Sequence, residues 1–380
     1  MHTNTPVIFF SHRTLEDWDF SNPDSVGIGG SETSHIELSW RLAARGHKVL
    51  SYAPTSYPGP VMHKGVEWRN CELCDFTREG IWFIYRCPEI LDKFPENHPN
   101  QVLIFVAQDT FYPGATVERF DKLDHYMCLC SDHARATAIE WPTLKDKIFT
   151  SANGLKPEKV QEALAKNITR NPYRLMYASS PDRGLKNLSL VFTRAREYVP
   201  DLELHVYYGF DNMDKIINGK DPKRAYVVKR AKDDLMKSLD KPGITFHGRT
   251  AQPQLYEEWC KAGLWVHPTS FSETGAITSM EAMALGAIPV TNPIWALKDN
   301  VQYGVLIDGN PDSDLLVRSR YVGEIIRLTS DVGGTALQSV IRSEMMGYAI
   351  SKFSWEVPTH QLSEMINKFS TEEEVAYVNG

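Results

Sequence analysis

Short apolar runs alternate with amphipathic stretches along the first part of the chain. Five runs have the length of a strand, namely Val7–Phe10, Lys48–Ala53, Ile81–Tyr85, Val102–Ala107 and Tyr126–Cys130. Between the first two, residues 31–45 have the apolar spacing of a helix, and Gly46 follows where helices commonly end. Strands and helices that alternate in this way favour a parallel sheet with helices on both faces.

The same alternation restarts after Pro172. It predicts a helix over Leu185–Tyr198 and five strands, Tyr173–Ala178, Glu203–Tyr208, Ile244–His247, Leu264–His267 and Ile288–Thr291. The polar segment Lys156–Asn171 is the natural linker, and a last helix is expected at about Pro358 to Phe369, ahead of an acidic tail. We therefore predict an α/β protein with two doubly wound, Rossmann-like domains, over residues 1–160 and 172–355, that face a cleft.

Length and composition agree with this organisation. The chain has 380 residues, enough for two or three domains, and its 42% hydrophobic and 23% charged residues are typical of a soluble globular protein. The apolar runs are too short to span a bilayer and no secretory signal is visible, so we expect a cytoplasmic protein without a membrane span. A net charge of −7 does not favour a nucleic-acid partner. The most basic stretch, Lys220–Lys232, is more simply interpreted as a solvated helix or loop.

The six cysteines allow two interpretations. Cys128 and Cys130 fall on a strand expected over His125–Ser131, where they share one face, and only Cys71 and Cys74 have the spacing of a zinc knuckle. Buried free thiols are therefore favoured over a zinc site.

The segment Phe271–Asn292 carries the most specific candidate chemistry. Glu273 and Glu281 lie eight positions apart, on either side of Gly275-Ala276. A helix that begins near Ala276 places Glu273 in the loop ahead of it and Glu281 in its second turn. The free N–H groups at such a helix start suit an anion, and the flanking carboxylates suit hydroxyl groups. The segment thus predicts a pocket for a sugar nucleotide.

Three further loops follow predicted strands. Gly27–Glu32, with Gly29 and Gly30, precedes the first helix and allows a phosphate or sugar to approach the backbone. In Ser179–Lys186, Arg183 and Lys186 are placed to neutralise phosphate charge. His247–Thr250 is placed to border a nucleobase. A capped glycine turn, a surface ion pair and a routine turn are the respective alternatives.

Two-acid patterns occur at Asp17–Asp19 and Asp312–Asp314, both in loop-like surroundings. Most such pairs are solvated, so we predict no metal site.

Together these segments resemble the retaining glycosyltransferases of the GT-B fold, family 4, over nearly the whole chain. The most specific match is the Glu273…Glu281 segment with its EAMALGAIPV run. Moderate matches are the glycine loop, Arg45-Gly-His47, Asn153-Gly154, Phe246-His-Gly248, His267-Pro and Phe353-Ser-Trp355.

The resemblance implies a role for each site residue on the donor side. Glu273 contacts hydroxyls of the donor sugar, and Glu281 binds the ribose. The N–H groups of Gly275, Ala276 and Ile277 face the sugar and the diphosphate. Arg249 and Thr250 border the base. Gly29 and Gly30 close over the phosphates.

The resemblance also shows departures from the family pattern. Arg183-Gly184 takes the place of the family's Lys-Gly, and Ser179 or Ser180 stands where an Arg is common, so Lys186 is the second cation we expect. Gln108-Asp109 replaces a His beside the donor sugar. The C-terminal helix, residues 356–380, is expected to pack back on the N-terminal, acceptor-side domain.

The sequence therefore predicts a metal-independent hexosyl- or pentosyltransferase without a cofactor. It moves a sugar, with anomeric retention, from a nucleoside diphosphate sugar to a hydroxyl of a glycan or other compound. The aromatics Trp18, Phe111 and Tyr112 form either an acceptor platform or part of the core. A nucleic-acid acceptor stays open but is not favoured. The alternatives are a non-catalytic nucleotide-sugar-binding protein and a sugar-nucleotide epimerase on the same scaffold.

Overall fold

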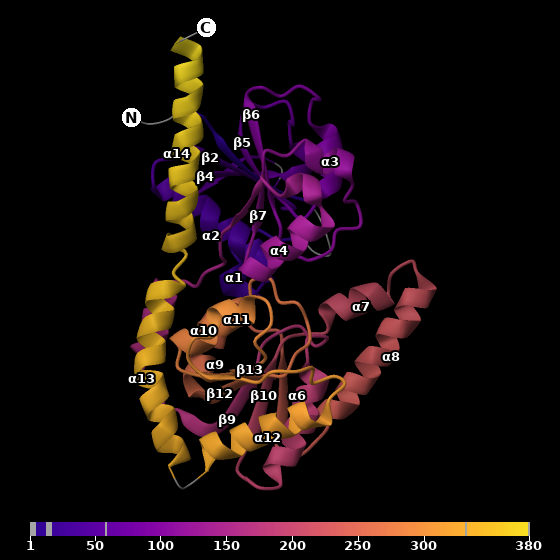
Figure 1. Ribbon diagram of the computed structural model, residues 1–380, viewed down its shortest axis with the longest axis vertical. Coiled ribbons are helices and arrows are strands. Elements are labelled where there is room, and N and C mark those ends of the chain that lie inside the picture. The colour runs from indigo at the N-terminus through magenta and orange to yellow at the C-terminus, as the bar shows by residue number, and fades with distance from the viewer. Residues whose placement is uncertain (1–4, 13–16, 58, 331–332, 379–380) are drawn as a thin grey trace. The chain divides into compact units, whose positions relative to one another are not determined.

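A computed structural model describes residues 5–12, 17–57, 59–330 and 333–378 (Figure 1). Its internal contacts divide the chain into two compact units. Unit 1 comprises residues 1–23, 28–154 and 353–380, and unit 2 comprises residues 24–27 and 155–352. Each unit is built around one sheet, and each is described separately below.

Unit 1 contains an eight-stranded sheet with the order β3-β4-β2-β1-β5-β6-β7-β8. Its strands are β1 (Val7–Ser11), β2 (Val49–Ala53), β3 (Val61–His63), β4 (Val66–Asn70), β5 (Gly80–Tyr85), β6 (Gln101–Val106), β7 (His125–Cys128) and β8 (Ile148–Thr150). All neighbours are parallel except β3 and β4. The strand order reverses between β1 and β5, and at such a switch point ligands bind beyond the carboxyl ends of the strands.

The central strands of unit 1 are buried on both faces. Every residue of β1 and β5 is buried, which explains why their sequences read as unbroken apolar runs instead of alternating ones. The helices of this unit are α2 (Gly30–Ala44), α3 (Val117–Asp121), α4 (Ser131–Glu140) and α14 (Glu356–Val378), with short 3-10 turns at Cys71–Leu73, Pro88–Lys93 and Pro142–Leu144. Glu356, in the first turn of α14, pairs with Arg41 and Arg45 at the end of α2.

Unit 2 contains a six-stranded, all-parallel sheet with the order β11-β10-β9-β12-β13-β14. Its strands are β9 (Asn171–Tyr177), β10 (Glu203–Tyr207), β11 (Ile244–Gly248), β12 (Ala262–His267), β13 (Ile288–Thr291) and β14 (Val305–Leu306). Here the order reverses between β9 and β12. The carboxyl ends of these two strands therefore mark the expected ligand edge of unit 2.

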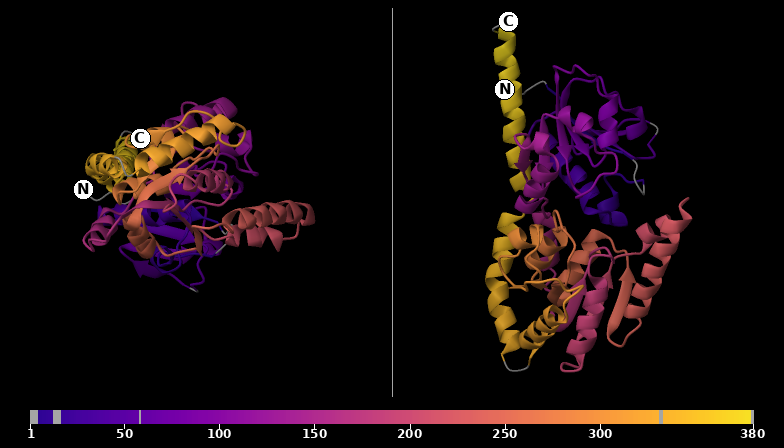
Figure 2. Two further views of the ribbon diagram at one scale, coloured as in Figure 1. Left: turned by 90° about the horizontal axis from the view of Figure 1, so that it is seen from below. Right: turned by 45° about the vertical axis from the view of Figure 1, so that its right-hand side comes forward.

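The helices of unit 2 connect these strands. They are α5 (Pro157–Leu164), α6 (Leu185–Arg196), α7 (Asp211–Ile217), α8 (Pro222–Leu239), α9 (Gln252–Lys261), α10 (Ile277–Ala284), α11 (Ala296–Asn300), α12 (Leu315–Thr329) and α13 (Gly334–Lys352). The short helix α1 (Asn22–Ser25) has residues in both units. Figure 2 shows the α7–α8 pair extending outward from the edge of unit 2. The basic stretch Lys220–Lys232 lies there on a largely exposed helix, whose buried residues are Leu235 and Leu239.

The predicted α/β class with two doubly wound sheets is confirmed. Three local expectations were wrong. The expected linker contains α5, because Pro157 fits the first helical turn without loss of a hydrogen bond and Val160 and Ala163 are buried at helical spacing. The strand β7 ends at Cys128, and Cys130 caps α4, so the two thiols do not share a strand face. The end expected at Phe369 was also wrong: the last helix begins at Glu356, within the expected range 356–380, and continues to Val378.

The six cysteines are free, and four of them, Cys71, Cys128, Cys130 and Cys260, are buried. Across the described ranges, no helix combines the length and the apolar character that a membrane crossing requires.

The glycine at position 154 is required by close packing within unit 1. A Cβ atom there would lie 2.8 Å from the backbone nitrogen of Trp355 and 2.9 Å from the carbonyl oxygen of Phe353. We expect Gly154→Ala to lower the free energy of unfolding by about 1–3 kcal/mol, because backbone atoms must shift to admit the methyl group. Urea unfolding measures this. Gly59→Ala is the control, because no atom lies within 4 Å of its Cβ position, and equal losses in both variants would contradict the prediction.

Candidate functional site

The candidate site of unit 2 lies where the loops after β9 and β12 meet. Gly184, at φ +103°, lets the two loops pack against each other, since a Cβ atom there would clash with the carbonyl oxygen of Pro268. Ser179 Oγ lies 3.3 Å from Thr278 Oγ1, which joins the loop after β9 to the first turn of α10. The switch point of the sheet thus brings together segments about 90 residues apart in sequence.

An ion pair connects the two loops. Arg183 Nη1 donates to Glu273 Oε2 at 2.8 Å. The guanidinium also lies over the ring of Phe271, 4.3 Å from its centroid. The Glu273 side chain is buried, whereas 33% of the Arg183 side chain is exposed. The Arg183 guanidinium is therefore partly exposed at the surface of the site, and the Glu273 carboxylate lies buried beneath it.

Glu273 stays ionised although it is buried. Burial raises the pKa of its carboxyl, but the charge of Arg183, together with the neighbouring His267 ring, outweighs burial, so the pKa lies below the usual range. His267 Nε2 lies 3.6 Å from Glu273 Oε1, and the His267 ring is fully buried and stacked on Trp265. A buried carboxylate with a fixed orientation is suited to accept hydrogen bonds from hydroxyl groups.

The helix α10 begins directly after this pair. Ala276, its N-cap, has left-handed backbone angles (φ 45°, ψ 50°), which are uncommon for a residue with a side chain and often occur at functional sites. The carbonyl of the preceding Gly275 accepts a hydrogen bond from Asn300 Nδ2 at 3.2 Å. Ala276, Ile277 and Thr278 are partly exposed, and the first turn of a helix has N–H groups without intrahelical partners. The predicted helix start near Ala276 is confirmed.

Glu281 lies in the second turn of α10 and is also buried. Its Oε1 accepts a hydrogen bond from Gln252 Nε2, on α9, at 2.9 Å. Burial raises the pKa of Glu281 to about 7, against the opposing effect of Gln252. The two acids of the segment therefore differ: Glu273 is paired with a cation, whereas Glu281 is held by a hydrogen bond from the Gln252 amide and its burial dominates its pKa.

The other predicted donor residues lie at the same edge of the sheet but not all in this cluster. Ser180 accepts a hydrogen bond from Tyr177 through its carbonyl, at 2.8 Å. Lys186 is exposed in the first turn of α6, and no described contact joins it to Arg183 or Glu273. Arg249 and Thr250 follow β11, and Arg249 Nη1 lies 3.9 Å from Asp211 Oδ2.

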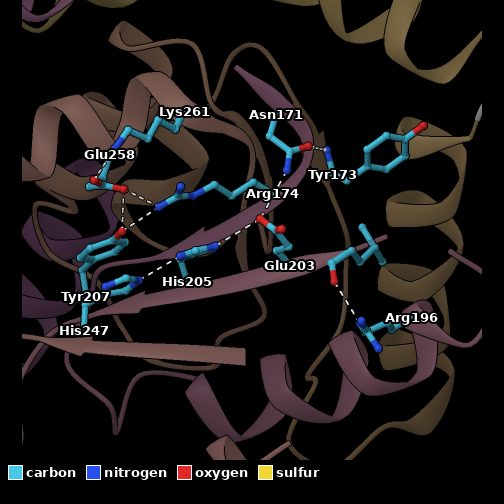
Figure 3. A network of polar contacts seen from close by, with 11 residues as sticks. Asn171, Tyr173, Arg174, Arg196, Glu203, His205, Tyr207, His247, Glu258 and Lys261 are labelled. Atoms are coloured by element: carbon cyan, nitrogen blue, oxygen red, sulfur yellow. Dashed lines mark hydrogen bonds and ion pairs between the residues drawn. The ribbon is translucent and has the colours of Figure 1, made fainter. Parts of the chain in front are cut away.

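A polar network on the face of the unit 2 sheet holds β11 in place (Figure 3). His205 Nδ1, on β10, and His247 Nε2, on β11, are 2.9 Å apart, and the His247 ring stacks on Tyr207. The Tyr207 hydroxyl donates to Glu258 at 2.7 Å, and Arg174 joins the same carboxylate. This network connects β9, β10, β11 and α9, and so positions the strand end that carries Arg249.

Unit 1 has a polar cluster at its own switch point. Arg86 follows β5 directly, has φ +60°, and donates to Asp109 Oδ2 at 2.6 Å and to Glu32 Oε1 at 3.2 Å. Gln108 and Asn153 exchange hydrogen bonds between their amides and are buried. Asp109 is thus an ion-pair partner, whereas Gln108 is fixed below the surface.

The glycines of the first loop form the start of α2. Gly29 is the N-cap, and its carbonyl accepts from the backbone N–H and the hydroxyl of Thr33, at 3.0 and 2.9 Å. Gly30 is the first helical residue. Like the start of α10, this helix start is partly exposed, but its first turn carries an acid, Glu32.

The two-acid patterns have structural roles. Asp312 accepts hydrogen bonds from Asn187 and Ser270, and Asp314 caps α12. Asp19 accepts from Ser21 and from the Tyr57 hydroxyl. Within the described ranges, no group of three or more His, Cys, Asp or Glu side chains is arranged to hold a metal ion.

The sequence did not point to several residues of these clusters. Arg86 and Gln252 sit at the ends of regular elements, but their partners are 23 and 29 residues away, so spacing gives no signal. Phe271, the first residue of the recognised segment, and His267, of the matched His267-Pro, were named without any contact to Arg183 or Glu273 being expected. An aromatic residue two positions before Glu273 was the one available hint.

Of the two alternatives for Trp18, Phe111 and Tyr112, the core holds for Trp18 and Tyr112, so the three do not form one exposed platform. Trp18 is buried against His35, and Tyr112 is buried with its hydroxyl accepting from the Asp109 N–H at 2.8 Å. Phe111 alone of the three is exposed, at 71%.

Comparison with solved structures identifies the fold. No protein-family model and no curated protein matches the sequence. The structure is similar to sucrose-phosphate synthase from Thermosynechococcus elongatus, with a TM-score of 0.69 and 15% identity over 97% of this chain and 100% of that chain. It is also similar to Anabaena HepE in complex with UDP-glucose, with a TM-score of 0.67 and 13% identity over 96% and 100% of the two chains.

A third similar structure is the UDP-forming α,α-trehalose-phosphate synthase from Burkholderia vietnamiensis, with a TM-score of 0.68 and 10% identity over 97% and 100% of the two chains. Likeness at such low identity defines the fold and not the activity. The chain has the GT-B fold of two Rossmann-like units, as the resemblance in sequence implied.

The pKa of Glu281 predicts a pH-dependent stability. The folded protein retains a proton on Glu281 at pH values where the unfolded chain has lost it, so the acid destabilises the fold progressively as the pH rises from about 4.5 to about 7. We expect Glu281→Gln to match the wild type at pH 4 and to exceed its free energy of unfolding by roughly 2–3 kcal/mol at pH 8. Urea unfolding at both pH values measures this difference. Glu344→Gln, an exposed position on α13, is the control, and a pH-independent effect of Glu281→Gln would contradict the prediction.

Proposed function

We propose that the protein is a retaining, metal-independent glycosyltransferase that uses a nucleoside diphosphate sugar as donor. The observation that carries this proposal is the Arg183–Glu273 pair at the switch point of unit 2, next to the start of α10. A cation and free helix N–H groups suit a diphosphate, and two buried carboxylates suit sugar hydroxyls. The GT-B fold supports the same activity, because HepE, which shares it, is described with UDP-glucose bound.

The geometry suggests one role for each donor contact. Glu273 accepts hydrogen bonds from hydroxyls of the transferred sugar, while Arg183 and the N–H groups of Ala276 and Ile277 hold the diphosphate. Glu281 accepts from the ribose hydroxyls, and Gln252 keeps its carboxyl oriented. Arg249 and Thr250 border the base. This assignment makes the nucleotide the larger part of the binding surface, and a hexosyl or pentosyl group the transferred one.

Retention follows in this proposal from attack on the same face as the leaving group. The acceptor oxygen forms a bond to the anomeric carbon as the bond from that carbon to the phosphate oxygen breaks. The acceptor proton passes to the departing phosphate oxygen, so no external base is needed. Negative charge grows on the diphosphate during this step, and Arg183 and the helix N–H groups stabilise it where it develops.

The direct test is transfer with analysis of the product. The protein is incubated with a series of nucleoside diphosphate hexoses and pentoses and hydroxylated acceptors, with and without EDTA, and the anomeric configuration is determined by NMR. We expect a retained configuration and the same rate in EDTA. Donor isomerised without acceptor would instead identify an epimerase, and bound but unreacted donor would identify a binding protein.

Loss of the Glu281 carboxylate should weaken donor binding. A hydrogen bond to a charged group contributes about 1.5–3 kcal/mol, so we expect Glu281→Ala to raise the donor Kd on the order of 10- to 100-fold in calorimetry. Wild-type affinity should also increase from pH 6 to pH 8, because the ionised carboxylate is the stronger acceptor and its pKa is about 7.

Two comparisons make the Glu281 prediction specific. In Glu281→Gln the pH dependence should disappear, and in Glu344→Ala the donor Kd should stay unchanged. Unchanged donor affinity in Glu281→Ala would rule out the ribose role.

Removal of the Arg183 charge should affect the chemical step. Because the charge that Arg183 neutralises develops in the transition state, we expect Arg183→Gln to lower kcat by about 10²–10³ with a smaller change in KM. Arg183→Lys retains a charge and should recover part of kcat. Arg194→Gln, at an exposed position of α6, is the matched control. A raised KM with unchanged kcat in Arg183→Gln would show that Arg183 only binds the ground state.

A further inference from the structure

A cavity in unit 1 lies between the loop after β6 and helix α4. Its volume is about 260 Å³ and its walls include Phe111, Tyr112, Tyr126 and Trp141. Both the loop and α4 follow carboxyl ends of parallel strands, and the cavity begins at Thr110, directly after the ion-paired Asp109. It is therefore placed at the ligand edge of unit 1, beside the polar cluster at its switch point.

Three of the aromatic walls are held rigidly by the core. Phe105 lies 5.1 Å from Tyr112 and 5.3 Å from Tyr126, measured between ring centroids, and Phe120 lies 5.0 Å from Trp141. Phe105 and Phe120 are themselves fully buried. The rings that line the cavity are thus fixed before any ligand enters, which lowers the entropic cost of binding.

Phe111 has a different position from these three residues. It lines the cavity, yet 71% of its side chain is exposed, so it contributes little to the core. A large exposed aromatic side chain at the mouth of an aromatic-lined cavity is typical of a residue that packs on a ligand.

The polar groups of the cavity indicate the charge of its ligand. His133, Thr137 and Glu140 lie along one side of α4 and line the cavity together. Burial lowers the pKa of His133 to about 4, so this ring is neutral near pH 7. Among the described lining residues there is no lysine or arginine, and Glu140 is the one acid. A phosphorylated or carboxylated ligand would find no cation here, whereas hydroxyl donors would find a carboxylate.

The size of the cavity restricts the ligand further. Pockets for drug-sized molecules usually measure about 300–1,000 Å³, so this one holds a single ring and its substituents. A base within a nucleic acid brings phosphates that need neighbouring cations, and the cavity lacks them. A sugar ring carries both an apolar face for the aromatic side chains and hydroxyl groups for Glu140 and Thr137.

We infer that this cavity binds a neutral sugar ring of the acceptor. The inference rests on the proposed transferase function only in identifying the bound sugar as the acceptor, because binding of a sugar ring to the cavity requires no donor. It assigns Phe111 and Glu140 as acceptor-binding residues and predicts that the natural acceptor is an uncharged glycan or glycoside.

Binding is tested without nucleotide sugar, by saturation-transfer NMR on the full chain. The probes are methyl α- and β-glycosides of common hexoses, with glucose 6-phosphate and thymidine as charged and nucleoside counterparts. We expect neutral glycosides to bind and the other two to bind more weakly. Phe111→Ala and Glu140→Gln should each lower glycoside affinity about fivefold or more. Ile139→Ala is the matched control, because this neighbour of Glu140 is 75% exposed and does not line the cavity.

The outcomes separate this inference from the proposed function. Glycoside binding that is weakened by both variants supports the cavity, whether or not transfer is observed. Absent glycoside binding, unchanged binding in Phe111→Ala, or a preference for thymidine or the phosphorylated sugar would overturn it, even for an active transferase. Far-UV circular dichroism confirms that each variant is folded.

Discussion

The ion pair between Arg183 and Glu273 is the constraint on which the candidate site depends. A buried carboxylate is stable in its charged form only if a cation or several donors offset the cost of burial. Arg183 does so, and its loop must therefore stay packed against the loop after β12, which the absence of a side chain at Gly184 permits. The sheet already sets the spacing of β9 and β12, and the pair holds together the two loops that follow them, next to the first turn of α10.

The two acids of the α10 segment show how environment separates the properties of identical side chains. Glu273 has a low pKa because Arg183 and His267 outweigh its burial, whereas Glu281 has a raised pKa because burial outweighs the hydrogen bond from Gln252 and the charge of Lys156. In the proposed reaction the first acid is a permanent acceptor for sugar hydroxyls. The second gains its full strength as an acceptor only when it ionises, so donor binding and protonation are linked at Glu281.

The sequence predicted the elements that have a local pattern, and it missed the contacts between side chains that the order of the strands brings together. The buried central strands β1 and β5 and the start of α10 were recognised, because apolar runs and a break in helical spacing are local signals. The edge strands β3 and β14 have only three and two residues, too few for a periodic pattern to be visible. The contact between Gln252 and Glu281 and the left-handed Arg86 arise only when the sheets are assembled. The sequence left Trp18 open between an acceptor platform and the core, and the structure places it in the core because it packs against His35 of α2.

The most direct test of the central claim is a crystal structure of the protein with an unreactive nucleoside diphosphate sugar. The account predicts the diphosphate within hydrogen-bonding distance of Arg183 and of the N–H groups at the start of α10. It also predicts the ribose hydroxyls on Glu281 and the sugar hydroxyls on Glu273, with the ion pair opened or shared. A nucleotide bound elsewhere, with the Arg183–Glu273 pair untouched, would contradict the account.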